Sequence, residues 1–355
     1  MLLASCAPRG VLAPAPPGVA EERVIFVGST RAEGLPGDAN PGFGRRESLA
    51  LARYDVAIPP QHETGSLSIP LEGRRTDPSR DYLVARSETY PQPAAFRGAL
   101  SRQLVKSGGE VVVFVHGFNT NFAEGLFRLA QLGADFDLPE TLVYYSWPSR
   151  GNVLAYAYDR DSALFARDGL QDLLAQLRAS GARRILLVGH SMGAALTMET
   201  LRQMAISAET ETLSRLSGVV LISPDIDVDV FRAQARRVGK LPQPFLIFTS
   251  QKDKALGLSS RIAGERTRLG NLRDISRVAD LQLTIVDVGA FNTRDGHFNV
   301  ANNPALIRLL RGAGQVAGVL EGEQASRANL ASGVVLSVQN ATQIILMPIG
   351  ALGGG

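Results

Sequence analysis

The chain has 355 residues, of which 45% are hydrophobic and 20% charged, and its formal net charge is +3. These values are typical of a globular protein with one large core or two smaller ones. The basic residues form no stripe with interleaved aromatics, so the sequence gives no support for nucleic-acid binding. Cys6 is the single cysteine, which excludes an internal disulfide and a cysteine-based metal site. The four histidines are far apart and lack metal-ligand spacing, so we expect neither a metal nor a cofactor.

The first 20 residues are predicted to lie outside the folded domain. Leu3-Ala4-Ser5-Cys6 resembles a bacterial lipobox, but the basic n-region and most of the apolar h-region are missing. Two interpretations stay open: a lipoprotein anchored through Cys6 in the cell envelope or periplasm, or the disordered start of a cytoplasmic protein. Residues 11–20 are rich in Pro and Ala and predict an extended, flexible tether. No apolar run approaches the roughly 20 residues that span a bilayer.

The region that follows predicts antiparallel edge strands on a larger sheet, because no change in composition marks a separate domain. The expected strands are residues 23–28, 48–58, 67–71 and 82–86. Residues 96–106 predict a helix that ends at Gly108-Gly109.

From residue 111 strands alternate with helices. Apolar runs predict buried strands at residues 111–115, 142–147, 185–188, 219–223, 245–249 and 281–288. Helices are expected after a cap at Asn119 or Thr120, across residues 170–177 and across 228–238. This alternation predicts an α/β fold with a mostly parallel sheet and helices on both faces, which binds ligands beyond the carboxyl ends of its strands.

The predicted catalytic domain therefore spans residues 21–310. The tail, residues 311–355, is rich in Gly and Ala and weakly patterned. Within it, residues 334–338 and 344–347 are expected to dock as a strand or a short helix.

The stretch from Arg183 to Leu196 carries the central motif. The apolar run 185–188 leads directly into Gly189-His190-Ser191-Met192-Gly193, and helix-forming residues follow. This strand–turn–helix context is typical of a nucleophile elbow, in which a tight turn holds the serine hydroxyl clear of the sheet. Ser191 is therefore the candidate nucleophile.

A serine nucleophile needs a base, and the base needs an orienting acid. Only His297 follows Ser191 in the order serine, acid, histidine that this elbow implies. Asp253, just past the strand at 245–249, is the first choice for the acid. Asp225, past the preceding strand, is the alternative, although an aspartate after Pro224 also suits a turn or a helix cap.

The oxyanion of the tetrahedral intermediate requires preorganised donors. The expected donors are the backbone N–H groups of Met192 and of Phe118, in the loop that follows the strand at 111–115. Asn119 is expected either to assist at the substrate pocket or to cap the next helix. Trp147 is expected either to line the acyl pocket or to be buried in the core.

Together these segments resemble an α/β-hydrolase fold enzyme, and more narrowly a group of bacterial hydrolases catalogued as a domain of unknown function. The resemblance covers roughly residues 20–310 and implies an esterase-type serine hydrolase without a cofactor. The shared motifs are His116-Gly117-Phe118-Asn119, Tyr145-Ser146-Trp147-Pro148, the elbow at Ser191 and Ser223-Pro224-Asp225-Ile226-Asp227.

The short segment between Ser223 and Phe245 has room for one helix only, which predicts no large cap domain and a relatively open site. The leading hypothesis is hydrolysis of a small-molecule or lipid-like carboxylic ester through an acyl-Ser191 intermediate. Amide or thioester hydrolysis and acyl transfer use the same groups and stay open. A non-catalytic binding protein anchored in the envelope is the alternative from another class. The sequence does not predict an oligomeric state.

Overall fold

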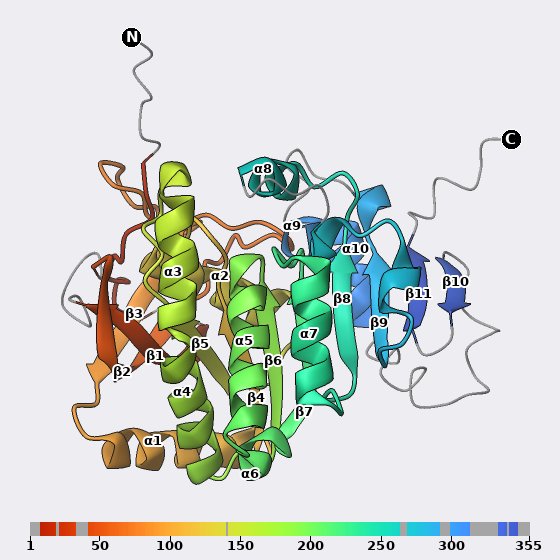
Figure 1. Cartoon of the computed structure of the whole chain (residues 1–355). Helices are drawn as coiled ribbons and strands as arrows, with labels where there is room; N and C mark the ends of the chain where they lie inside the picture. Colours follow the sequence, from red (N-terminus) through yellow and green to blue (C-terminus); the bar gives the residue numbers. More distant parts are fainter. Residues whose placement is uncertain are drawn as a thin grey trace, which may run out of the picture.

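The computed structural model describes residues 8–18, 21–32, 42–139, 141–262, 268–291, 299–312, 333–338 and 341–346. In these residues a single 11-stranded sheet runs in the order β10-β11-β9-β8-β7-β6-β4-β5-β1-β2-β3 (Figure 1). The strands are β1 (Glu22–Ala32), β2 (Gly44–Ala57), β3 (Leu83–Thr89), β4 (Glu110–Val115), β5 (Leu142–Ser146), β6 (Arg184–His190), β7 (Leu216–Ile222), β8 (Phe245–Thr249), β9 (Leu283–Asp287), β10 (Gly333–Val338) and β11 (Ala341–Leu346).

The central strands are parallel, as the alternating pattern predicted. Every neighbouring pair from β5 through β4, β6, β7 and β8 to β9 is parallel, and β1 is parallel to β5. The early strands β2 and β3 continue the sheet in antiparallel fashion beside β1, which confirms the expected antiparallel edge. The carboxyl ends of the parallel strands therefore meet at one edge of the sheet.

Helices cover both faces of the sheet, and alternate residues of β4 show why. Val111, Val113 and Val115 belong to a core with α1, α4, α5 and α7, whereas Val112 and Phe114 pack with α2 on the opposite face. This period of two is what a strand buried on both faces requires. The α-helices are α1 (Pro93–Lys106), α2 (Phe122–Asp135), α3 (Tyr156–Phe165), α4 (Arg167–Ala179), α5 (Met192–Ile206), α6 (Thr210–Leu213), α7 (Val228–Val238), α8 (Lys254–Ile262), α9 (Asn299–Asn302) and α10 (Pro304–Gly312).

Short 3₁₀ helices complete the connections. They are η1 (Val153–Ala155), η2 (Leu269–Asn271), η3 (Ile275–Val278) and η4 (Gly289–Phe291). The connection from β7 to β8 contains one helix, α7, and no cap domain, as the sequence spacing predicted.

Two local predictions differ from the structure, and the prediction that the tail docks as a strand is confirmed. Residues 67–71 form no strand; Leu71 makes only an isolated bridge with Gly10. The cap of α2 is Asn121 rather than Asn119 or Thr120: its side chain accepts from the N–H of Glu124, and the Glu124 side chain accepts from the N–H of Asn121. This reciprocal capping box satisfies two amides at once, which favours Asn121 over its neighbours. In the tail, β11 pairs in parallel with β9, so the tail extends the sheet.

The segment after Pro8 is extended, as its composition predicted, but it is held to the protein rather than free. The N–H of Val11 donates to Pro70 O at 2.9 Å, and that of Ala15 donates to Val84 O at 2.8 Å. Its start lies against the loop between β4 and α2. Cys6, the predicted lipidation site, lies outside the described residues. Among the helices that the structure does describe, none has both the length and the apolar character of a membrane span.

Candidate active site

Ser191 lies in the turn between β6 and α5, at the carboxyl edge of the sheet. Its backbone has φ 52° and ψ −119°, a strained conformation for a residue with a side chain. Its N–H donates to Ile222 O at 2.9 Å, and its carbonyl accepts from the N–H of Asp225 at 3.2 Å. The end of β7 thus holds the turn in place, which is how a nucleophile elbow stores its strain.

The elbow packs directly against the loop after β4. A Cβ on Gly193 would overlap the carbonyl groups of Val115 and His116, so only glycine allows this approach. A Cβ on Gly117 would lie 3.0 Å from the Cβ of Ser191. Because two glycines permit the contact, the backbone of the β4–α2 loop lies immediately beside the serine.

The two predicted oxyanion donors have amides available for a ligand. Within the described residues, neither the N–H of Phe118 nor that of Met192 donates to a protein acceptor. Phe118 follows Gly117, and Met192 follows Ser191. Met192 is the first residue of α5, where helix amides have no intrahelical partner, and Phe118 lies in a half-buried loop, so both amides can bind a ligand. Their occurrence on the two segments that meet at Ser191 is consistent with a site prepared for an anionic oxygen.

Arg31, at the end of β1, is fully buried and binds this loop through hydrogen bonds. It was not identified from the sequence. Its guanidinium donates to the carbonyls of Thr120 at 3.0 Å and Ser149 at 2.9 Å, and to Ser146 Oγ at 2.9 Å. One nitrogen lies 3.4 Å from His116 Nε2. The signal in the sequence is the polar run Ser29-Thr30-Arg31 directly after an apolar strand, at the same edge as the other motifs.

His116 braces the loop as a neutral ring. Burial, and then the charge of Arg31, lower the pKa of His116 to about 3. His116 Nδ1 lies 2.8 Å from Gly117 O. His116 Nε2 lies 3.1 Å from Trp147 O. A neutral imidazole has one N–H, so His116 donates to one of these two carbonyls, and both lie beside the oxyanion loop or the strand next to it.

Trp147 and Asn119, the two predicted pocket residues, are engaged by the protein. Trp147 is fully buried, stacks on His116 with ring centroids 4.9 Å apart and donates from Nε1 to His116 O at 2.7 Å. Of its two expected roles, the structure shows the core one. Asn119 has a φ of 55°, and its side-chain oxygen accepts from Arg9 at 2.8 Å. Its side chain neither caps α2 nor lies free.

Asp253 is placed just past β8 and is 4% exposed. One carboxylate oxygen accepts from the N–H of Leu256 at 3.0 Å, at the start of α8. The N–H of Val288 donates to Thr249 O at 2.9 Å, so the ends of β8 and β9 are joined where Asp253 and the segment after β9 leave the sheet.

Asp225, the alternative acid, is surrounded by partners. Its carboxylate accepts from Tyr156 Oη at 2.9 Å and from Ser259 Oγ at 3.0 Å, and Arg268 Nε lies 3.3 Å away. Burial, and then the charge of Asp225, raise the pKa of Tyr156, so this hydroxyl stays protonated and donates. Sequence reasoning missed Tyr156 and Arg268, because no local pattern reports a partner so distant in the chain.

His297 lies outside the described residues. The described residues on either side of it are fixed at the carboxyl edge. Phe291 is buried after β9, and Asn303 Nδ2 donates to Phe291 O at 2.9 Å, which ties together the two ends of the intervening segment. The carbonyl of Ala301 accepts from Gln131 Nε2 of α2 at 3.0 Å.

The surroundings of Ser191 are more enclosed than the sequence spacing predicted. Ser191 is only 2% exposed although no cap domain is present. Tyr156, at the start of α3, packs edge-on against Phe118 with ring centroids 5.4 Å apart and donates to Asp225. The side chain of Tyr156 therefore packs beside the elbow although the β7–β8 connection contains no cap domain.

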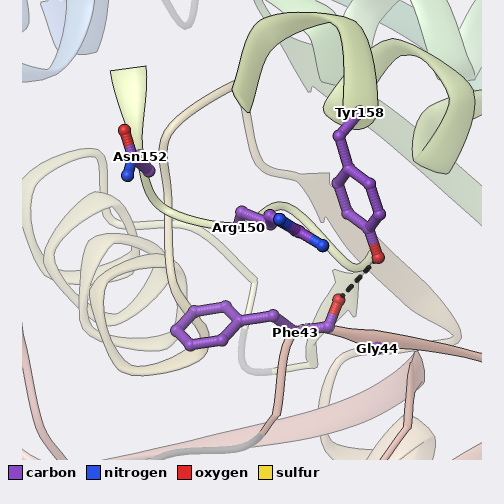
Figure 2. A pocket seen from close by; sticks show the side chains of 5 residues that line it. All are labelled: Phe43, Gly44, Arg150, Asn152 and Tyr158. Atoms are coloured by element: carbon purple, nitrogen blue, oxygen red, sulfur yellow. Dashed lines mark hydrogen bonds between the residues drawn. The ribbon is translucent and has the colours of Figure 1, made fainter. Parts of the chain in front are cut away.

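Two surface pockets are lined by other residues. A pocket of about 300 Å³ lies among Phe43, Gly44, Arg150, Asn152 and Tyr158; Figure 2 shows the Arg150 side chain between the Phe43 and Tyr158 rings. A second, of about 350 Å³, is lined by Gly239, Lys240, Leu241, Asp280, Leu281 and Gln282. Neither includes a predicted site residue. Across the described ranges, no group of three or more His, Cys, Asp or Glu side chains is arranged to hold a metal ion.

The fold and the elbow define an α/β hydrolase. A family described as alpha/beta hydrolase of unknown function (DUF900) matches residues 92–313, which is more than half of the chain. The chain belongs to this family. No curated protein matches it significantly.

Several solved structures have a similar fold. A thermophilic and thermostable carboxylesterase cloned from a metagenomic library shares 13% identity and a TM-score of 0.35, covering 85% of this chain and 88% of that one. An esterase of Pyrococcus furiosus shares 10% identity and a TM-score of 0.34, covering 89% and 98%. A fungal esterase structure from Rhizomucor miehei shares 13% identity and a TM-score of 0.32, covering 83% and 86%. At these values the similarity carries no argument about substrate or mechanism.

Proposed function

We propose that this α/β hydrolase cleaves carboxylic esters with Ser191 as the nucleophile. The observation that carries the proposal is that the turn between β6 and α5 and the loop after β4 meet at Ser191. A serine held at φ 52° contacts the Gly117 loop, and the amides that follow on each segment, Met192 and Phe118, have no acceptor within the described residues. A nucleophile and two donors around one small space suit acyl transfer.

The reaction follows from these positions. Ser191 Oγ forms a bond to the ester carbonyl carbon while its proton passes to His297, the proposed general base. The carbonyl π electrons move to the oxygen, which the two amides stabilise. When the intermediate collapses, the alkoxy group leaves with the proton from His297. Water then attacks the acyl-Ser191 ester by the same steps, and the acid is released.

Asp253 is the proposed orienting acid for His297. It lies at the end of β8, beside β9, whose following segment contains His297. Asp225 is a poorer candidate because Tyr156, Ser259 and Arg268 already engage its carboxylate. An acid with those partners has little capacity left to accept a bond from an imidazole.

Replacement of Ser191 tests the proposal. Ser191→Ala is expected to remove hydrolysis of p-nitrophenyl acyl esters and labelling by a fluorophosphonate. Ser207→Ala, which changes an exposed serine at the other end of α5, is the matched control and is expected to keep both. Wild-type turnover by Ser191→Ala would exclude the proposed nucleophile. A panel of ester, amide and thioester substrates with competing alcohols then separates the related chemistries.

A further inference from the structure

Arg9 bonds directly to the loop that carries the Phe118 amide. Its guanidinium donates to Asn119 twice, to Oδ1 at 2.8 Å and to the backbone oxygen at 3.0 Å. It also donates to Gly151 O at 2.6 Å and to Glu124 Oε2 at 2.5 Å. One planar cation thus joins the loop after β4, the start of α2 and the loop after β5, an arrangement that a lysine ammonium does not reproduce.

The neighbouring residue strengthens this attachment. The N–H of Gly10 donates to Glu124 Oε1 at 3.1 Å, and the carbonyl of Gly10 accepts from Asn121 Nδ2 at 2.8 Å. Glu124 and Asn121 are the capping box of α2. The first described residues of the chain therefore attach to the helix whose N-terminus ends the oxyanion loop.

We infer that Arg9 is a positioning residue for the oxyanion loop, an inference that rests on the proposed function. Asn119 follows Phe118 directly and holds a left-handed φ of 55°, which is unfavourable without compensation. Arg9 binds both oxygens of this residue from the outer side, while Arg31 binds the next carbonyl, that of Thr120, from within. The two arginines fix the backbone on which the Phe118 amide is oriented.

Both arginines lie outside residues 92–313, the part that the family matches. The region with the hydrolase motifs therefore does not contain all the groups that hold its oxyanion loop. The first residues of the chain, which the sequence predicted to lie outside the folded domain, thus contain in this interpretation a residue that positions the oxyanion loop through Asn119.

The test compares Arg9→Ala and Arg9→Lys with wild type, with active sites counted by fluorophosphonate titration so that kcat refers to competent serines only. We expect kcat to fall roughly tenfold in Arg9→Ala with KM nearly unchanged, because a loosened donor weakens the transition state more than the ground state. Arg9→Lys should recover only part of the loss. Arg86→Ala, which removes an exposed ion pair with Glu88 on β3, is the matched control.

Two further measurements separate positioning from a general structural effect. Glu124→Gln keeps a capping-box side chain but removes the charge that holds Arg9, so it should lower kcat and add nothing in the double variant with Arg9→Ala. Guanidinium ion at millimolar concentration should restore part of the activity of Arg9→Ala and none in Glu124→Gln.

An unchanged kcat per active site in Arg9→Ala, or additive effects in the double variant, would overturn the inference while leaving the proposed function intact. An inert wild type whose Ser191 takes no label would instead remove the proposed function, and the inference with it.

Discussion

At the scale of single residues, the two aspartates at the carboxyl edge differ in their proposed roles. Asp253→Asn is expected to keep the fold and lower kcat by about 10³–10⁴, because an amide no longer selects the tautomer of the base. Asp225→Asn removes the charge that lies beside buried Arg268 and weakens the acceptor of Tyr156 and Ser259, so it should lower the free energy of unfolding by about 1–3 kcal/mol. Two measurements on both variants distinguish the acid from the structural aspartate: kcat per titrated active site, and the free energy of unfolding in urea. The reverse pattern would make Asp225 the acid.

His116, in the oxyanion loop, is expected to make the free energy of unfolding depend on pH. Its pKa in the folded protein is about 3, below the value of about 6.5 in an unfolded chain. Between these limits the unfolded state binds more protons, so this contribution to stability is complete above pH 6.5 and is lost as the pH falls. The expected loss is about 2 kcal/mol between pH 6.5 and pH 5.

The measurement is urea unfolding at pH 7 and pH 5 for wild type and His116→Gln. The variant has a lower overall stability because it loses a buried brace, so only the change with pH is compared. Subtracting the change in unfolding free energy of the variant from that of the wild type removes the contribution of carboxylates that titrate in the same pH range. Equal changes in the two proteins would show that His116 does not stay neutral on folding.

At the scale of elements, the sequence predicted the parts whose signals are local. The apolar runs at β4, β6 and β8 are continuous because both faces of a parallel strand are buried, and each was predicted within a residue or two. The short segment between Ser223 and Phe245 had room for one helix, and its predicted bounds, Val228–Val238, are those of α7. The elbow at Ser191 was predicted from two glycines and a strand, all within nine residues.

Elements whose role depends on distant contacts were missed. Residues 67–71 alternate like a strand, but they find only a single bridge partner, Gly10, and stay irregular. The composition of the first residues does not indicate that Arg9 binds the folded domain. Its four acceptors come from three separate segments. Tyr156 and Arg268 meet Asp225 from 69 and 43 positions away in sequence, a distance at which periodicity has no information.

At the scale of the whole molecule, the start of the described N-terminal segment and the proposed catalytic residues share one edge of the sheet. Arg9 reaches Asn119 in the oxyanion loop at that edge, whereas Ala15 bonds to Val84, near the start of β3 and away from the catalytic edge. We propose that Cys6 carries the lipid that its lipobox-like context predicts. Two residues separate Cys6 from Arg9, and the three Cα–Cα steps between them reach about 11 Å at full extension. A lipid on Cys6 would therefore hold the catalytic edge close to the membrane surface and favour lipid-like esters.

Fractionation of cells that express the full-length protein tests this orientation. The wild type should sediment with membranes, and mass spectrometry of its N-terminal peptide should show acyl groups on Cys6. Cys6→Ser should release the protein into the soluble fraction. Because the serine does not alter the bonds of Arg9, its kcat on a soluble p-nitrophenyl ester should equal that of wild type, whereas its rate on a vesicle-embedded ester should fall. An unmodified Cys6 in the mature protein would remove the anchor and leave Arg9 as the sole function of this segment at the catalytic edge.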